Sequence, residues 1–142
     1  SINVKATSFD LGGEGWGYHD NSPSNEGGNF RTGEGVDTEN DGNNIGHTND
    51  GEWLNYTIHC AVEGDYDVAV EVASPNDNAG PVHFELDGGN VTGAITLANT
   101  TDWQKYAMFR GTMHIPAGKH ILRFVWERAN ANMRGYTFTR KN

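Results

Sequence analysis

The chain has 142 residues, a formal net charge of -9 at pH 7 and 19 glycines, and 11% of its residues are aromatic. This length fits a single domain over residues 1–142, and the acidic charge argues against nucleic acid and membrane surfaces as partners. The aromatic content is too high for a disordered chain, so the polar residues must lie in loops around a hydrophobic core.

Apolar and polar residues alternate along much of the chain, and no segment shows a helical period. The alternation predicts strands at residues 2–9, 53–60, 66–73, 82–86, 94–97, 104–110, 120–126 and 135–139, with short extended pieces near Phe30 and Val36. About nine or ten short antiparallel strands indicate an all-β fold, a β-sandwich of the jelly-roll type. The single cysteine, Cys60, is in phase with the apolar face of its strand, so we expect a buried small hydrophobic residue.

The longest irregular segment covers residues 10–44, and long loops in compact domains are usually functional or held by specific contacts. Trp16 and Tyr18 lie in it and either contact a ligand or pin the loop in place. Residues 37–42 resemble the start of a calcium loop, but Thr48 stands where the bidentate Glu would be. The oxygen-rich loops could still hold a structural Ca²⁺ outside residues 37–48, although the sequence does not indicate its ligands.

A sugar-binding interpretation begins with Trp103, which follows the polar loop 99–102. A pyranose has an apolar C–H face that can cover an indole and a rim of hydroxyls that need hydrogen bonds once dehydrated. Amide and carboxylate side chains, such as those of the downstream segment 130–132, provide such bonds. The alternative for Trp103 is a core position at a strand edge.

Two other side chains have a functional and a structural interpretation. Trp53 shares the polar face of its strand with Asn55, so it either lines a second cleft on a sheet face or covers the sheet. His47 either binds or stacks on a ligand or is structural, and no pair of histidines has the spacing of a zinc site.

An enzyme would need two carboxylates facing each other across a cleft. Glu39, Glu52 and Asp102 are available, but a chain with 19 acidic residues offers such pairs by chance. No Ser/His/Asp cluster, nucleophile elbow or phosphate-binding Gly loop is present in the sequence.

Eight motifs follow one another in the order of a known family: residues 17–31, 35–39, 44–47, 51–56, 64–68, 101–104, 116–120 and 132–138. Together they resemble a family 6 carbohydrate-binding module over nearly the whole chain. The loop around Tyr18-His19-Asp20 resembles the modules attached to marine agarases and related hydrolases.

The resemblance implies a non-catalytic β-sandwich whose loops at one end sandwich a terminal sugar between two rings. It implies Trp103 and His47 as the ring positions, with Tyr18 as a weaker candidate for a second plate, and Glu39 and Asn132 as partners of sugar hydroxyls. In some members a second cleft lies on the concave sheet face, where Trp53 and Asn55 would lie.

This chain departs from the family pattern at two places. His47 replaces the usual Tyr or Trp, and Lys5 and Thr7 stand where two Glu often hold a structural calcium.

The resemblance therefore leads us to expect a module excised from a larger secreted, extracellular glycoside hydrolase and covalently linked to its catalytic domain there. The expected ligand is agarose or its neoagaro-oligosaccharides, held at chain ends. The alternatives are the same module binding xylan or a β-glucan, or a small glycoside hydrolase using Glu39 and Asp102.

Overall fold

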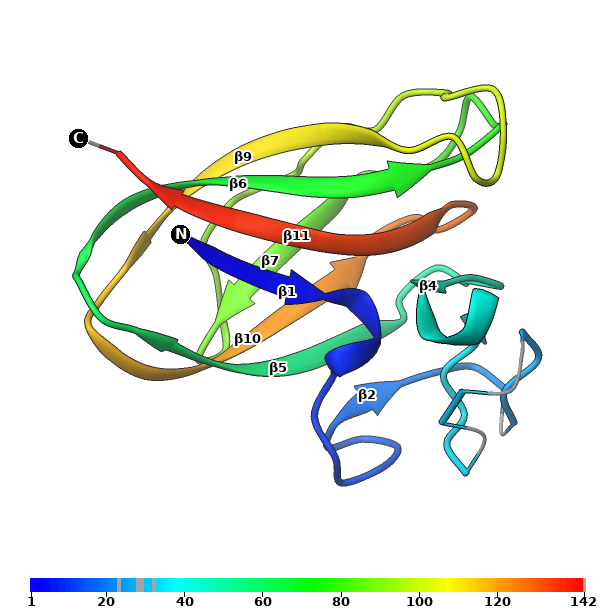
Figure 1. Ribbon diagram of the computed structural model, residues 1–142, viewed down its shortest axis with the longest axis horizontal. Coiled ribbons are helices and arrows are strands. Elements are labelled where there is room, and N and C mark those ends of the chain that lie inside the picture. The colour runs from blue at the N-terminus through cyan, green and yellow to red at the C-terminus, as the bar shows by residue number, and fades with distance from the viewer. Residues whose placement is uncertain (23, 28–29, 32, 142) are drawn as a thin grey trace.

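The computed structural model describes residues 1–22, 24–27, 30–31 and 33–141, and it has two antiparallel sheets packed face to face (Figure 1). Pro23, Gly28 and Asn29, which belong to the motif at residues 17–31, lie outside the described residues. Eleven strands and two short 3₁₀ turns are found in the described part, so the expected β-sandwich is confirmed with slightly more strands than predicted. No helix in that part could cross a membrane.

The first sheet, sheet A, is built around the C-terminal strand of the chain. Its order is β3 (Thr38–Glu39), β4 (Asn44–Ile45), β11 (Asn132–Arg140), β6 (Gly64–Ala73) and β9 (Ala107–Ile115), and β1 (Ile2–Lys5) also pairs with β11. The turn η2 (Asn40–Gly42) connects β3 to β4, and η1 (Ala6–Ser8) follows β1.

The second sheet, sheet B, carries the strands that alternate most regularly. Its order is β2 (Tyr18–His19), β5 (Trp53–Cys60), β10 (Gly118–Trp126), β7 (Val82–Leu86) and β8 (Gly89–Asn90). Asp87 and Gly88 join β7 to β8 with φ angles of 48° and 94°. Two left-handed residues are what a tight two-residue hairpin turn needs, so the sequence Asp-Gly explains this turn.

Aromatic rings from both sheets meet between the layers. Phe84 is fully buried and its ring contacts those of Phe124, Tyr136 and Phe138 at centroid distances of 5.4, 4.8 and 5.8 Å. These are edge-to-face contacts, which aromatic pairs favour. The predicted alternation of β5, β6, β10 and β11 thus places its apolar residues in one core.

Three predicted strands differ clearly from the structure, and those predicted at 66–73, 120–126 and 135–139 mainly begin earlier, at Gly64, Gly118 and Asn132. Strand 2–9 ends at Lys5, where η1 begins, and in segment 94–97 only Ile95 pairs, at a single bridge to Val82. The strand predicted at 104–110 is found at Ala107–Ile115 instead. Side chains of Asn99 and Asp102 accept hydrogen bonds from the backbone N–H groups of Thr101 and Gln104, and such local bonds compete with a strand ladder.

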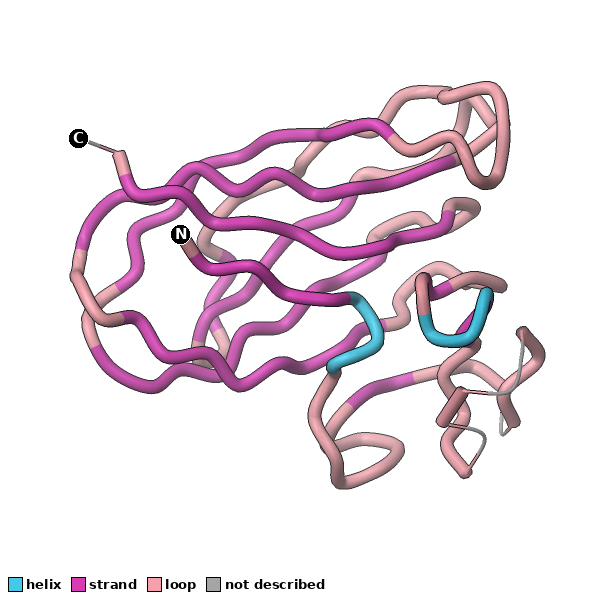
Figure 2. Tube along the Cα trace, in the orientation of Figure 1, coloured by secondary structure: helices cyan, strands magenta, loops and turns pink. Residues whose placement is uncertain are grey.

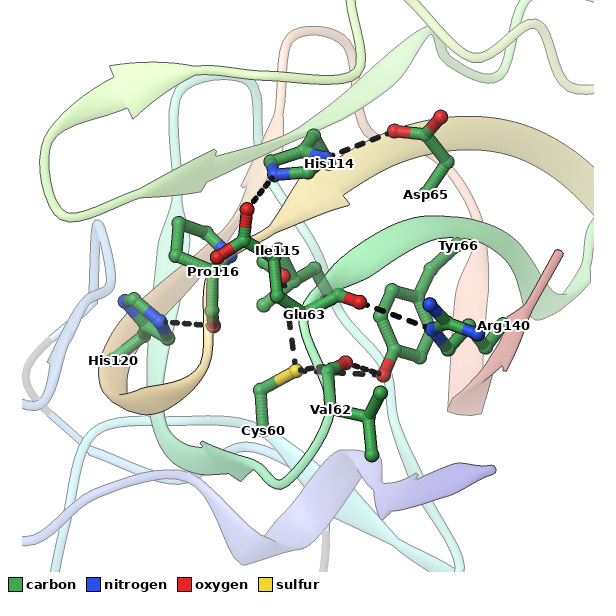
Figure 3. Close-up of polar contacts among 10 residues, drawn as sticks. All are labelled: Cys60, Val62, Glu63, Asp65, Tyr66, His114, Ile115, Pro116, His120 and Arg140. Carbon is green, nitrogen blue, oxygen red and sulfur yellow. Dashed lines mark hydrogen bonds and ion pairs between the residues drawn. The ribbon is translucent and has the colours of Figure 1, made fainter.

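Loops gather at one end of the sandwich and short turns at the other (Figure 2). Cys60 lies at the turn end, where it is 1% exposed and its thiol is 3.2 Å from the Val62 carbonyl oxygen (Figure 3). The Tyr66 hydroxyl donates to the same carbonyl. The expectation of a buried, structural cysteine is confirmed.

Arg31 ties the long N-terminal segment to the start of the chain. Its guanidinium donates to the carbonyl oxygens of Thr7 and Phe9 at 3.1 and 2.6 Å, pairs with Glu34 at 2.6 Å and lies 3.5 Å from the centre of the Phe9 ring. A permanent cation therefore contacts the backbone beside the two positions where the family often has calcium ligands.

The residues at those positions do not fit a calcium ion. Lys5 is exposed and cationic, and the Thr7 hydroxyl already donates to the Gly42 carbonyl oxygen at 2.8 Å. Among the described residues no group of three or more His, Cys, Asp or Glu side chains is placed to hold a metal. A Ca²⁺ ion elsewhere stays a prediction from the sequence.

We expect Arg31→Ala to lower the free energy of unfolding by about 2 kcal/mol, because it leaves Glu34 and two carbonyl groups without their partner. Urea unfolding followed by Trp fluorescence measures this. Arg110→Ala, at an exposed position of β9, is the matched control and should change stability by less than about 0.5 kcal/mol. Equal effects of the two substitutions would contradict the role given to Arg31.

Candidate functional site

A cavity of about 430 Å³ opens among the loops at one end of the sandwich. This volume lies within the range typical of small-molecule sites. Its lining comes from four separate parts of the chain: Glu39, His47, Thr48, Trp103, Gln104, Asn130, Ala131 and Asn132. Four of the five residues expected at the main site, namely Glu39, His47, Trp103 and Asn132, are thus brought together although they span 93 sequence positions (132 - 39).

Trp103 supplies the aromatic surface of this cavity. Its side chain lies in the loop before β9 and keeps 44% of its surface exposed, so it is not a core residue. The loop is anchored behind it, because the backbone N–H of Thr100 donates to the Ser74 carbonyl oxygen and the Thr100 hydroxyl accepts from the Ser74 N–H. A half-exposed indole on a fixed loop is a platform for an apolar ligand face.

The Glu39 carboxylate is held in place by two neighbours at the end of β3. One oxygen accepts from the Asn44 amide at 2.8 Å and the other lies 3.2 Å from His47 Nε2. Asn44 is itself buried and fixed by the Asn40 amide. A carboxylate oriented in this way can accept hydrogen bonds from ligand hydroxyls with its remaining lone pairs.

Gly46 lies directly against this carboxylate. A Cβ atom added at Gly46 would overlap the carboxyl group of Glu39, so a glycine is needed for Glu39 to keep its position. His47 then follows with a φ of 47°, in the left-handed region, and its ring keeps about half of its surface exposed.

Asn132, the first residue of β11, closes the side of the cavity next to Trp103. Its amide nitrogen donates to the Trp103 carbonyl oxygen at 2.9 Å, which leaves its side-chain oxygen to accept a bond from a ligand. Thr48 links the two flanking loops, because its hydroxyl donates to the Ala131 carbonyl oxygen at 2.9 Å. The cavity therefore combines an aromatic platform, a carboxylate and an amide in fixed positions.

Tyr18 and Asp102 do not belong to the lining. Tyr18 is 5% exposed, its ring packs edge-on against Phe9, and its hydroxyl accepts a bond from the Gly35 N–H. Tyr18 therefore pins the long loop and cannot act as the second plate in this conformation. Asp102 caps its own turn, so no pair of carboxylates built from Glu39 and Asp102 faces across the cavity.

The second cleft expected at Trp53 and Asn55 is filled by protein. The Arg123 guanidinium lies 3.6 Å from the Trp53 ring centre and donates to the Asn55 side-chain oxygen, and the Asn55 amide donates to the Trp16 carbonyl oxygen. Asn55 is 6% exposed. The Asn55 side chain is therefore engaged by protein, and Arg123 covers a face of the half-buried Trp53 ring.

Several lining or supporting residues were not identified from the sequence. Thr48 and Gln104 are sequence neighbours of His47 and Trp103, which is the only signal that could have indicated them. Asn44 and Gly46 act behind Glu39, and their role follows from contacts that spacing alone does not reveal.

Two buried carboxyl groups next to the site hold its loops. Burial raises the pKa of Glu52 to about 7, although its oxygens accept from the N–H groups of Asn21 and Asn49. Burial also raises the pKa of Asp37 to about 6, and one of its oxygens has no partner among the described residues. At the turn end, hydrogen bonds that the imidazoles donate to carboxylates raise the pKa values of His114 and His120.

All four shifts have the same consequence for stability. A pKa that is higher in the folded than in the unfolded protein stabilises the fold below the unfolded pKa, and this contribution is lost as the pH rises through the folded pKa. For Glu52 and Asp37 that window runs from about pH 4 to 7, and for the histidines it begins at their ordinary value of 6.5.

We therefore expect the melting temperature to fall as the pH rises from 5 to 8, with a loss on the order of 1–2 kcal/mol from the two buried carboxyls. Calorimetry over this pH range measures it. Glu52→Gln should flatten the profile, whereas the exposed control Asp77→Asn should leave it unchanged. A melting temperature that rises with pH over this range would contradict the raised pKa values of Glu52 and Asp37.

Comparison with known proteins agrees with the fold. Residues 26–140 match the family model for carbohydrate binding module, family 6. Beta-agarase AgaA of Microbulbifer thermotolerans is 30% identical over 108 residues, which are 76% of this chain and 23% of the agarase. The clotting factor G alpha subunit of Tachypleus tridentatus is 27% identical over 101 residues, 70% of this chain and 15% of that protein. The chain thus spans less than a quarter of either relative.

Solved structures with the same fold include two modules of this family. The module CBM6cm-2 from Cellvibrio mixtus lichenase 5A, solved with cellotriose, has a TM-score of 0.69 at 23% identity, covering 99% of this chain and 98% of that one. The C-terminal module of the marine laminarinase LamC from Zobellia galactanivorans has a TM-score of 0.71 at 24% identity, covering 98% of both chains.

The family match covers residues 26–140, which is most of the chain, and the solved modules of this family share its β-sandwich fold. The chain belongs to family 6 of the carbohydrate-binding modules, and it is a non-catalytic binding module.

Proposed function

We propose that this module binds agarose and neoagaro-oligosaccharides at chain ends and so directs a covalently linked, extracellular polysaccharide hydrolase to its substrate. The match to a beta-agarase, of which the chain covers 23%, supports both the ligand and the linkage. The proposed ligand is a neutral or lightly charged galactan, so the net charge of -9 does not repel it strongly.

The observation that carries this proposal is the half-exposed Trp103 ring in a cavity that also holds Glu39 and Asn132. The indole covers the C–H face of one sugar unit, the Glu39 carboxylate accepts from its hydroxyls, and the Asn132 side-chain oxygen does the same. His47 flanks the sugar beside Glu39. A single stacked sugar with several hydrogen bonds gives an affinity in the micromolar to millimolar range, roughly -4 to -8 kcal/mol.

The position of the cavity among the loops at one end of the sandwich supports binding at a chain end. Its volume of about 430 Å³ is bounded by the Trp103 loop on one side and the His47 loop on the other. A terminal unit can enter such a space more easily than the middle of a polymer can.

A second candidate ligand is a different neutral polysaccharide. Related modules have been solved with cellotriose and with xylose, and another is described as binding β-1,3-glucan. Their identities to this chain are below 25%, so they support the fold and not the choice of sugar.

Pull-down on insoluble agarose, xylan, cellulose and β-1,3-glucan tests the proposal. We expect retention on agarose and release by neoagaro-oligosaccharides. Retention on xylan or a glucan alone would reassign the ligand, and no retention on any of the four would contradict sugar binding by this cleft.

A further inference from the structure

A second cavity of about 520 Å³ adjoins the Trp103 cavity. The two share Thr48 and Asn130 in their linings, so they adjoin at these residues, and the pair of neighbouring cavities is here called the trough. The second cavity, here called the outer cavity, is also lined by Asn21, Asp50, Asn78 and Arg128, and it has no aromatic residue. A sugar unit placed there would be recognised by polar contacts and not by stacking.

Arg128 is the only lysine or arginine among the described residues that line either cavity. Its side chain is exposed, and its guanidinium has no hydrogen bond or ion pair to any described residue. The guanidinium groups of Arg31, Arg123 and Arg134 are by contrast bound to Glu34, Asn55 and Glu71. Arg128 therefore has five N–H donors free for a ligand at the side of the trough.

The wall that carries Arg128 is fixed by backbone bonds. Its N–H donates to the Pro81 carbonyl oxygen at 3.2 Å and its own carbonyl accepts from the Gly80 N–H at 3.1 Å. The neighbouring Ala129 N–H donates to one Asp50 carboxylate oxygen at 2.8 Å, which holds this acid against the backbone of the wall. The position of Arg128 along the trough is thus set before a ligand arrives.

The Asn78 and Asn130 side chains add further polar groups. The Asn130 amide donates to the Asn78 side-chain oxygen at 3.1 Å, which leaves the Asn78 amide nitrogen as a donor toward the cavity. A planar guanidinium beside amide N–H groups matches the geometry of an oxyanion, which only accepts hydrogen bonds.

We propose that the outer cavity is a second subsite for a sugar unit that carries a sulfate ester or a carboxylate, with Arg128 as the residue that binds this substituent. The inference rests on the proposed function, because the stacked unit at Trp103 positions its neighbour in the outer cavity. It adds a preference that binding of a neutral sugar does not explain: the module selects galactan chain ends whose second unit carries an anionic substituent.

Isothermal titration at fixed ionic strength, in a buffer without sulfate or phosphate, tests this with three oligosaccharides of equal length. One is a neutral neoagaro-oligosaccharide, one carries a sulfate ester on the second unit, and one carries a carboxylate there. We expect the wild-type module to bind at least one of the charged ligands about tenfold more tightly than the neutral one, as a charge-assisted hydrogen bond provides. The charged ligand that binds more tightly than the neutral one identifies the substituent that the outer cavity recognises.

Arg128→Gln keeps a polar side chain that can donate hydrogen bonds, although a shorter one, and removes its charge. It should abolish the preference and leave the affinity for the neutral ligand within about twofold, whereas the exposed control Arg110→Gln should retain the preference. Equal affinities of the wild type for all three ligands, or a preference that survives Arg128→Gln, would overturn the proposal. If the wild type binds none of the three ligands, the proposed function itself fails. Equal binding of all three ligands would instead leave the proposed function intact and overturn only the second subsite.

Discussion

Trp103→Ala should lower the affinity for neoagaro-oligosaccharides by about 100-fold and leave the fold intact. An aromatic side chain that a ligand covers at the centre of a binding site contributes about 2 kcal/mol or more to binding. The fold should tolerate the change because the ring is 44% exposed, and because the bond from Asn132 goes to the Trp103 backbone carbonyl, which alanine keeps. Isothermal titration gives the affinity, and circular dichroism with thermal melting gives the fold.

Trp16→Ala is the matched control for this experiment. Trp16 is even more exposed, at 78%, but it lies in a loop that does not line the cavity. The control should bind like the wild type, so that a loss specific to Trp103 cannot be attributed to the removal of any surface indole. A Trp103→Ala variant that binds normally while Trp16→Ala does not would move the site to the N-terminal loop.

Gly46→Ala should lower the affinity by between about 10- and 100-fold, although Gly46 offers no side chain to a sugar. Its new Cβ atom would displace the Glu39 carboxylate from Asn44 and His47, and a hydrogen bond to a charged group contributes about 1.5–3 kcal/mol. The displaced group is the flexible end of a side chain, so the melting temperature should change little. The variant separates the orientation of Glu39 from its presence, and titration calorimetry measures the loss.

Gly89→Ala provides the control, since a Cβ atom there has only an ordinary contact with the Leu86 carbonyl oxygen on the edge of sheet B. Its binding should equal that of the wild type. Gly46→Ala with unchanged affinity would mean that the Glu39 carboxylate does not contact the ligand in its observed position. Glu39→Gln should then also bind normally, and the acidic partner would have to be sought elsewhere.

The sheets could be predicted from the sequence wherever burial alternates without interruption. Tyr56, Val70, Phe124 and Phe138 lie inside as their phase predicts, because a period of two along a strand leaves little choice of face. The prediction failed at residues 104–106, where the loop predicted at 99–102 continues in place of a strand, because side chains of Asn99 and Asp102 accept bonds from the backbone of this loop. Hydrophobic alternation carries no information about such bonds.

Most of the residues expected at the binding cavity could be predicted from the sequence, but their arrangement in space could not. Glu39, His47, Trp103 and Asn132 were indicated by the family motifs, and the structure places them around one cavity. Tyr18 carried the same kind of signal but is buried, because its ring meets Phe9 and its hydroxyl the Gly35 N–H.

The second cleft expected at Trp53 and Asn55 also shows that a sequence pattern can assign residues to a sheet face without revealing whether this face is covered. The alternation of β5 placed Trp53 and Asn55 on its outer face, yet whether that face is open depends on a neighbouring strand. Arg123 of β10 covers the Trp53 ring and bonds to Asn55. A contact between strands 68 positions apart (123 - 55) is not visible in the local pattern of either.

An NMR titration of ¹⁵N-labelled module with a neoagaro-oligosaccharide tests the central claim most directly, because it locates the ligand without changing the protein. We expect the largest shifts at the Trp103 indole N–H and the Asn132 side-chain amide, with smaller ones at the backbone N–H of Gly46. Shifts confined to the Trp53 and Trp16 indoles, with none at Trp103, would contradict the account.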